Sequence, residues 1–367
     1  MIAPRKALLR KLQTLWPAVG DGRLVRVLTH CLFSGEHLVA YNDRIALSVP
    51  QHSDFKGCIP AAVLTEILEA SRAAVVEMRP VGSDVVLVKL GDTSVMLPML
   101  PADTFRFQMP AVPTQNHIQG VARQFFDAVE HCLGSVGSEA RVYEQLGVTF
   151  IPNGSKVRLY AFDIKTMSFA QLALPRLGLK EKAILPADFC RQMLALAEQA
   201  HSTRLALPQR SPKRSRLADA LADHALFLAD DTLLFGRVLR SDKNQIDFDR
   251  AFKREVPADY AKAMVAIPQQ LQMALKRATL LADYGVAELA IENGKATFRS
   301  GSERGEISDT IPLPGHADIT ALVDAPLLFD RHAKFDNILF TDSCAIMAKD
   351  DHLCVVANPT SARSDSS

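Results

Sequence analysis

Two pairs of adjacent carboxylates are the residues best suited to hold a metal ion or to move a proton. Asp230-Asp231 and Asp350-Asp351 each lie between short apolar runs. Aspartate is also favoured in tight turns, so we interpret both pairs as hairpin turns. His30, His37 and His52 lack the spacing of metal ligands. We therefore expect no metal site and no cofactor.

Other enzyme motifs are also missing from the sequence. It contains no His-Glu-x-x-His, Walker A, Gly-x-Ser-x-Gly or Gly-x-Gly-x-x-Gly motif. The six cysteines form no Cys-x-x-Cys pair and lie in apolar contexts, which favours reduced cysteines in the core; they are Cys31, Cys58, Cys132, Cys190, Cys344 and Cys354. An enzyme whose site is assembled from distant residues is the weakest alternative, and we expect a protein that is not an enzyme.

Basic residues occur on three expected helices. The formal net charge is only +1, so any nucleic-acid surface must be a local concentration of charge. The charges opposite or beside the apolar stripes are Lys6, Arg10 and Lys11 in helix 5–16, Arg123 in helix 118–133, and Lys276 and Arg277 in helix 268–281. An ordinary solvated helix face explains this pattern equally well.

Two further regions bear on location and charge. The N-terminal stretch MIAPRKALLRKL carries charges where a signal peptide needs apolar residues, and we expect a cytoplasmic protein. The segment QRSPKRSRLAD contains Arg210, Lys213, Arg214 and Arg216. This basic segment is interpreted either as a solvated loop or as a loop that touches DNA.

The elements that position these residues occur in a repeated order. Apolar residues alternate on both sides of Pro152-Asn153-Gly154, which predicts an antiparallel hairpin. A strand over 167–174 and a helix from Pro186 follow. The order of helix, strands, helix and strands occurs three times, with first helices near 5, 118 and 268 and second helices near 60, 186 and 325. This predicts an α+β protein with three units of two helices on antiparallel sheet, over 1–112, 113–258 and 259–367.

Several segments resemble the bacterial DNA sliding clamp, the DNA polymerase III beta subunit. LPADTF (100–105) is similar to the Leu-Pro-Ala-x-x-Phe end of that family's first domain. Similar segments occur in register along nearly the whole chain, at GVTFIPNGSKVRLYAFDIKTMSFA (147–170), FDRAFKREVP (248–257), MALKRATLLAD (273–283) and FDNILFTDSCAIMAKDDHLCVVANP (335–359). The ordered set, more than any single motif, carries the resemblance.

The resemblance implies a fold and a function. Members of the family form head-to-tail homodimeric rings, with helices lining a hole through which duplex DNA passes without sequence readout. They act as processivity factors by tethering a DNA polymerase, which they bind, like the clamp loader, through short peptide motifs. The basic helix residues named above would then line the hole, and Arg23 matches a DNA-contacting arginine of the family.

The family's peptide groove is where this sequence departs most. The Thr-Asp-Gly-His-Arg-Leu segment is replaced by residues 162–167, and the C-terminal Val-Val-Met-Pro-Met segment by 355–359. The proline before Asp-Tyr-Arg-Arg is replaced by Arg250. The expected groove residues are Phe162, Ile164, Lys165, Met167, Arg250, Val355 and Val356. We expect weaker or altered peptide binding, and such divergence is more typical of a phage or mobile-element copy.

The subunit contact has support from the sequence and from the resemblance. In helix 268–281, one stripe faces its own sheet, whereas Met273 and Leu280 lie roughly opposite and Leu281 lies at the margin. A second apolar face indicates burial on both sides or a contact with another chain. The family places these positions against the residue that corresponds to Phe105. The rival hypothesis is a clamp-fold protein that binds replication or repair partners without encircling DNA.

Overall fold

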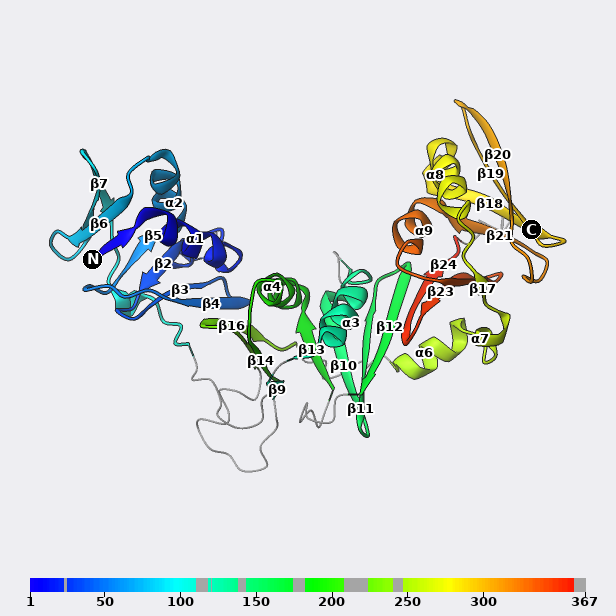
Figure 1. Ribbon diagram of the computed structural model, residues 1–367, viewed down its shortest axis with the longest axis horizontal. Helices are drawn as coiled ribbons and strands as arrows, with labels where there is room; N and C mark the ends of the chain where they lie inside the picture. The colour runs from blue at the N-terminus through cyan, green and yellow to red at the C-terminus, as the bar shows by residue number, and fades with distance from the viewer. Residues whose placement is uncertain are drawn as a thin grey trace, which may run out of the picture. The chain divides into compact units, whose positions relative to one another are not determined.

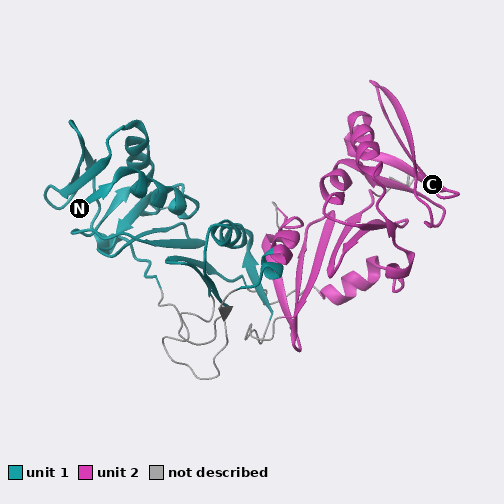
Figure 2. Ribbon diagram, viewed as in Figure 1, with its two compact units in different colours: residues 1–126, 174–240 teal, residues 127–173, 241–367 magenta. Residues whose placement is uncertain are grey.

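The computed structural model describes residues 1–22, 25–109, 118–119, 121–137, 143–173, 182–207, 224–239 and 247–359. The chain forms two compact units (Figures 1 and 2), unit 1 over 1–126 and 174–240 and unit 2 over 127–173 and 241–367. Residues of the expected middle domain are divided between the units, and the boundaries of three domains stay a prediction. No helix in the described residues is long and apolar enough to span a membrane.

Unit 1 contains two antiparallel sheets. The smaller has the strand order β1-β6-β7-β8 and the larger the order β5-β2-β3-β4-β16-β15-β14-β9. The strands of these sheets are β1 (Ile2–Pro4), β2 (His30–Phe33), β3 (His37–Tyr41), β4 (Ile45–Pro50), β5 (Gly57–Pro60), β6 (Val75–Pro80), β7 (Val85–Leu90), β8 (Thr93–Pro98), β9 (Ile118–Gln119), β14 (Thr203–Ala206), β15 (His224–Ala229) and β16 (Thr232–Arg237). A further strand, β13 (Ala183–Pro186), belongs to neither sheet.

Within its described residues, unit 1 has the α-helices α1 (Arg5–Leu15), α2 (Ala61–Ala70) and α4 (Ala187–Ala197). In α1, Leu8, Leu12 and Leu15 recur at helical spacing and are buried. Gly236 in β16 lets α4 approach closely, because a Cβ at this position would clash with the Phe189 ring. Helix α3 (Arg123–Leu133) begins in unit 1 and continues into unit 2.

Unit 2 also contains two antiparallel groups of strands. One has the order β10-β11-β12-β24-β23-β22-β17 and the other the order β20-β19-β18-β21. The strands are β10 (Gly147–Asn153), β11 (Lys156–Phe162), β12 (Thr166–Ala173), β17 (Val265–Ala266), β18 (Val286–Glu292), β19 (Lys295–Ser302), β20 (Gly305–Pro312), β21 (Ile319–Asp324), β22 (Asn337–Phe340), β23 (Cys344–Lys349) and β24 (His352–Ala357).

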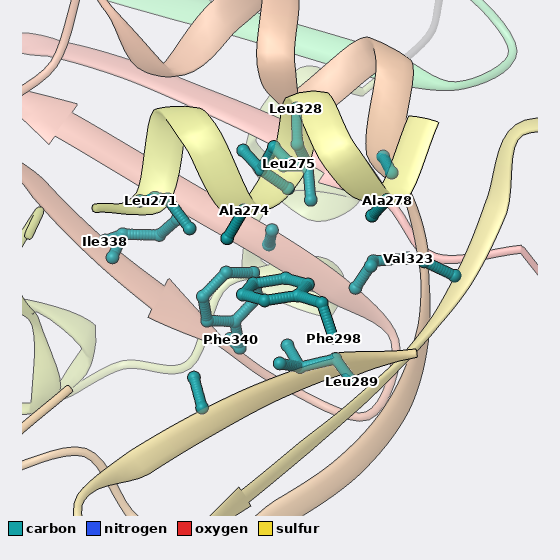
Figure 3. Packing of buried hydrophobic residues seen from close by; sticks show 14 of the residues in the cluster. Leu271, Ala274, Leu275, Ala278, Leu289, Phe298, Val323, Leu328, Ile338 and Phe340 are labelled. Carbon is teal, nitrogen blue, oxygen red and sulfur yellow. The ribbon is translucent and has the colours of Figure 1, made fainter. Parts of the chain in front are cut away.

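The core of unit 2 forms between these strands and two helices, α8 (Leu271–Leu281) and α9 (Ala325–His332). Figure 3 shows the buried stripe of α8 directed toward the rings of Phe298 and Phe340. The stripe is Leu271, Ala274, Leu275 and Ala278, as the helical spacing predicts. Burial of a leucine such as Leu275 contributes about 1.5–3 kcal/mol.

The predicted helices and strands agree well with the structure. All six expected helices are present as α1, α2, α3, α4, α8 and α9, although α3 begins at Arg123 and not at 118, where the structure has β9. The hairpin at Pro152-Asn153-Gly154 is confirmed as β10 and β11, with Gly154 at a φ of 61°. Two helices of unit 2, α6 (Phe248–Glu255) and α7 (Tyr260–Ala263), were not predicted.

Candidate functional site

The outward face of α1 carries two of its three predicted cations. Lys6 and Arg10 are exposed. Lys11 instead is half-buried, and its Nζ donates a hydrogen bond to Oε1 of Gln51 at 3.0 Å. Burial also lowers the pKa of Lys11. Lys6 and Arg10 are therefore available to a ligand, whereas Lys11 contacts its own unit.

The cations of α8 and α3 differ in the same way. Lys276 is exposed, but Nη1 of Arg277 forms an ion pair with Asp309 of β20 at 2.7 Å. Arg123 is exposed at the first residue of α3. Arg23 and the basic segment Arg210–Arg216 lie outside the described residues.

Acidic residues on α2 were not considered in the sequence analysis. Glu66 and Glu69 are exposed, at a spacing of three residues that places them on one helix face. Gln13 of the packed helix α1 donates to Oε1 of Glu69 at 3.3 Å. The helix surface of unit 1 therefore carries both charges. The three-residue spacing of the two glutamates in LTEILEA already indicated that they share one helix face.

The predicted subunit-contact residues have different exposures. Leu280 and Met273 are 69% and 47% exposed, and Leu281 is half-buried. Phe105 is only 5% exposed and packs with Val39 and Cys58 inside unit 1. Met273 and Leu280 therefore form an apolar surface on α8, whereas little of Phe105 is left for another chain.

Three predicted groove residues belong to one face of the unit 2 sheet. Phe162 pairs with Met167, and Met167 pairs with Val355, across β11, β12 and β24. Val355 is 5% exposed, within a cluster that includes Phe252 of α6. Val356 follows on the opposite face and is buried in the main core. Val356 therefore cannot line a groove in this arrangement.

The turn between β11 and β12 carries two more predicted groove residues. Asp163 accepts hydrogen bonds from the backbone N–H groups of Lys165 and Thr166 at 2.8 and 2.6 Å. Ile164 at the tip of this turn is 73% exposed. The Lys165 ammonium forms an ion pair with Asp324 at 2.7 Å, and Asp324 also caps α9 by accepting from the N–H of Leu327 at 3.1 Å. Lys165 therefore holds the turn to α9.

Helix α6 covers the same sheet face and carries Arg250, which is exposed. On its inner side, Phe248 stacks on Tyr160 with ring centroids 4.8 Å apart, and Phe252 lies 5.4 Å from Phe169. Asp249 accepts hydrogen bonds from Arg158 and from the Tyr160 hydroxyl, each at 2.9 Å. Burial and the Asp249 carboxylate together raise the pKa of Tyr160. The chain's own aromatic rings thus fill this part of the sheet face.

The paired carboxylates and the cysteines have structural roles. Asp230 and Asp350 have φ angles of 49° and 51° in turns, which confirms the interpretation as hairpin turns. All six cysteines are buried, and burial raises the pKa of Cys31 to about 12 and that of Cys58 to about 11. No group of three or more His, Cys, Asp or Glu side chains within the described ranges could hold a metal ion.

Comparison with solved structures identifies the fold of this chain. No family model and no curated protein matches the sequence. Solved structures match over 98% of the chain. They include a DNA polymerase sliding clamp from Pseudomonas aeruginosa (17% identity, TM-score 0.80, 99% of its chain covered), the DNA polymerase III beta subunit from Thermotoga maritima (16%, 0.80, 99%) and a sliding clamp from Bacillus subtilis (15%, 0.81, 98%). The chain has the α+β DNA clamp fold expected from its sequence.

Proposed function

We propose that this chain, which has the bacterial sliding-clamp fold, forms a homodimeric ring that encircles duplex DNA and tethers a DNA polymerase in the cytoplasm. The observation that carries the proposal is the clamp fold over 98% of the chain. In this role the protein catalyses no reaction. It stays on DNA because the ring encloses the duplex and because its cations attract the phosphates. The chain then comprises three clamp domains, with the boundaries expected from the sequence.

Lys6, Arg10 and Lys276 are the proposed phosphate contacts. All three are exposed, and none forms an ion pair with a residue that the structure describes. A lysine or arginine aimed at phosphates supplies affinity without reading bases. By the resemblance, Arg123 and Arg23 are also proposed as phosphate contacts. Arg123, Lys11 and Arg277 each already interact within the chain.

The proposed subunit contact is head-to-tail. In unit 1, β8 is an edge strand, and in unit 2, β20 is an edge strand that packs beside α8. Edge strands offer unpaired backbone groups to another chain, and Met273 and Leu280 add an exposed apolar surface on α8. An edge from one unit and a different edge from the other make a heterologous contact, which yields a ring where the geometry closes.

Solution mass tests this proposal. Light scattering over a concentration series should give the mass of two 40.2 kDa chains. A monomeric mass at every concentration would rule out the proposed ring.

The proposed polymerase and clamp-loader contact is the face of unit 2 around Phe162, Met167 and Ile164. Val355 and the rings of α6 fill much of this face, so a short apolar peptide motif finds less open surface than the sequence resemblance implied. We therefore propose weakened or altered binding of such motifs.

A clamp-fold protein that binds partners without encircling DNA is the second candidate. The observation that favours it is the pair Glu66 and Glu69 on the exposed face of α2. Helix α2 packs against α1, so the carboxylates of α2 would reduce the attraction of Lys6 and Arg10 to phosphate. Retention on circular DNA that is lost on linearisation separates the two candidates.

A further inference from the structure

Trp16 is the only tryptophan of the chain, and its side chain is 50% exposed. Tryptophan is highly buried on average, because its indole carries a large apolar surface. Within the described residues, the Trp16 indole forms no hydrogen bond and no contact with another aromatic ring. Much of the ring is therefore available to a ligand.

The backbone that carries Trp16 is held by hydrogen bonds. Trp16 begins a short 3-10 helix, Trp16–Ala18, directly after α1. Its carbonyl accepts from the N–H of Val19 at 3.0 Å, and the carbonyl of Pro17 accepts from Nδ2 of Asn42 at 2.9 Å. The exposed ring thus lies on an ordered turn, so a ligand that contacts it meets a surface that is already formed.

Exposed polar side chains of α1 lead up to the indole. They recur at spacings of four, three and three residues, so each is the surface neighbour of the next; the set is Lys6, Arg10, Gln13 and Trp16. Lys6 and Arg10 form no ion pair with a residue that the structure describes. One face of this short stretch therefore combines two available cations with an exposed aromatic ring.

Positive charge is concentrated around this face. Residues 1–29 contain six bases and one acid, a formal net charge of +5, whereas the whole chain has +1. The packed helix α2 opposes this charge at one point, where Oε1 of Glu69 accepts a hydrogen bond from Gln13 at 3.3 Å. Carboxylates of α2 weaken the attraction of phosphates, but they do not oppose a contact between the ring and a base. The local charge favours a polyanion over an apolar protein surface as the ligand.

We propose that Trp16 stacks on an unpaired base of single-stranded DNA, while Lys6 and Arg10 pair with phosphates of the same strand. Aromatic rings beside cations bind single strands with little dependence on sequence, because every base has a flat face. In a duplex these faces are covered by neighbouring base pairs, so the indole can stack only where the strand is unpaired. The inference rests on the proposed function in taking DNA as the partner, and it adds unpaired bases to the phosphates of the duplex.

The single tryptophan allows a direct test with the full chain. When the protein is excited at the red edge of the indole band, its emission comes from Trp16. The probes are a single-stranded oligothymidine, an abasic strand with the same number of phosphates, and a long duplex that exposes base faces only at its ends. Oligothymidine should quench the emission to a plateau, because the base stacks on the indole. The abasic strand and the duplex should quench little.

Variants separate stacking from charge, with the affinity measured by the anisotropy of labelled strands. W16L keeps an apolar side chain but removes the ring, and it should weaken oligothymidine binding by about tenfold, within the range for one lost stacked base. It should leave binding of the abasic strand unchanged, and W16F should recover part of the loss. K6A/R10A should weaken the binding of both strands. The control Y284L removes a fully exposed aromatic ring from unit 2 and should change neither.

Three results would overturn the proposal. They are oligothymidine that fails to bind or binds without quenching, equal affinity of the parent protein for oligothymidine and the abasic strand, and equal weakening in W16L and Y284L. Retention on circular duplex DNA should be the same in W16L and the parent protein. A parent protein that is not retained would contradict the ring and leave the stacking result intact, so the two failures are seen separately.

Discussion

The ring of Phe248 stacks on the ring of Tyr160, with centroids 4.8 Å apart and planes 24° apart. Phe248 comes from α6, and Tyr160 comes from the middle of β11. Asp249, the next residue of α6, accepts a hydrogen bond from the same tyrosine at 2.9 Å. The contact therefore fixes α6 over the face where the resemblance places a peptide groove.

Replacing Phe248 by alanine should destabilise unit 2 by about 3–5 kcal/mol, the usual cost of removing a buried phenylalanine. Phe248 is 2% exposed, so its removal leaves a cavity at Tyr160. Urea unfolding followed by circular dichroism measures the change. The exposed Lys253 offers the control K253A, which should cost under about 0.5 kcal/mol. Equal stability of F248A and the parent protein would mean that α6 is not held by this ring.

Asp324 has two separable roles. D324A removes both the cap of α9 and the ion pair with Lys165, and it should cost about 1–2 kcal/mol. D324N should recover most of that loss, because asparagine also caps helices and an ion pair with the exposed Lys165 is worth under about 1 kcal/mol. Thermal unfolding of both variants gives the comparison. A D324N protein as unstable as D324A would show that the ion pair, and not the cap, matters.

Stability should fall in mildly acidic solution because of His131. This side chain stacks on His352 with centroids 5.0 Å apart and makes a 2.9 Å hydrogen bond with the carbonyl of Leu353. Burial lowers the pKa of His131 to about 4, below the value of about 6.5 in an unfolded chain. The folded state thus favours neutral His131, and the stabilisation present above about pH 6.5 is lost as the pH falls toward 4, by about 1.4 kcal/mol per unit of pKa shift.

Urea unfolding between pH 7.5 and 4.5 measures this dependence. In H131Q the free energy of unfolding should depend less on pH, because the contribution of His131 is removed. The contribution of His352 should remain, since burial also lowers the pKa of His352. An identical slope in H131Q and the parent protein would assign the pH dependence to other groups.

The subunit contact predicts a change of mass on substitution at exposed positions. M273K/L280K places two cations on the apolar surface of α8 and should shift the dimer to monomer, because two desolvated lysines cannot be accommodated there. Both sites are well exposed, so folding should be preserved. Sedimentation velocity should show the shift, with Q272K, at another exposed position of α8, as the control. A double variant with the parent's mass would place the interface elsewhere.

Much of the fold was predictable because apolar residues recur at regular helical or strand spacing. The stripe Leu271, Ala274, Leu275 and Ala278 predicts the buried face of α8, and the alternation around Gly154 predicts the hairpin. Helix α6 was missed because residues 248–257 were interpreted only as a segment similar to the family, near the end of the second expected domain. The capping Asp247 and the four-residue spacing of Phe248 and Phe252 were the available indications.

The candidate site was less predictable than the fold. Periodicity placed Lys6 and Lys11 on the correct helix, and the resemblance indicated Phe105. The neighbours of Lys11 and Phe105 come from distant parts of the sequence. Gln51 accepts a hydrogen bond from the Lys11 ammonium, and Val39 and Cys58 pack against Phe105. Val356 was grouped with Val355 although adjacent strand residues face opposite sides. Such pairings depend on tertiary contacts that a single sequence does not reveal.

The proposed phosphate-binding residues make an electrostatic prediction. K6A/R10A/K276A should weaken sequence-independent DNA binding and reduce its salt dependence by about 0.9 in the logarithmic slope for each phosphate that is no longer neutralised. The control R79A/K89A/R299A removes three exposed cations from strands β6, β7 and β19 and should change the slope little. Equal weakening in both variants would mean that net charge alone, and no particular surface, attracts DNA.

Topological retention on circular DNA tests the proposed ring most directly. The protein is diluted to favour monomers and reconcentrated with nicked circular plasmid, and the mixture is then passed through a gel-filtration column in salt high enough to suppress simple electrostatic binding. The ring predicts that protein elutes with the circular plasmid, is released when a restriction enzyme linearises it, and is no longer retained in M273K/L280K. Dimeric protein that never elutes with the circle, or that stays bound equally to circular and linear DNA, would contradict the ring.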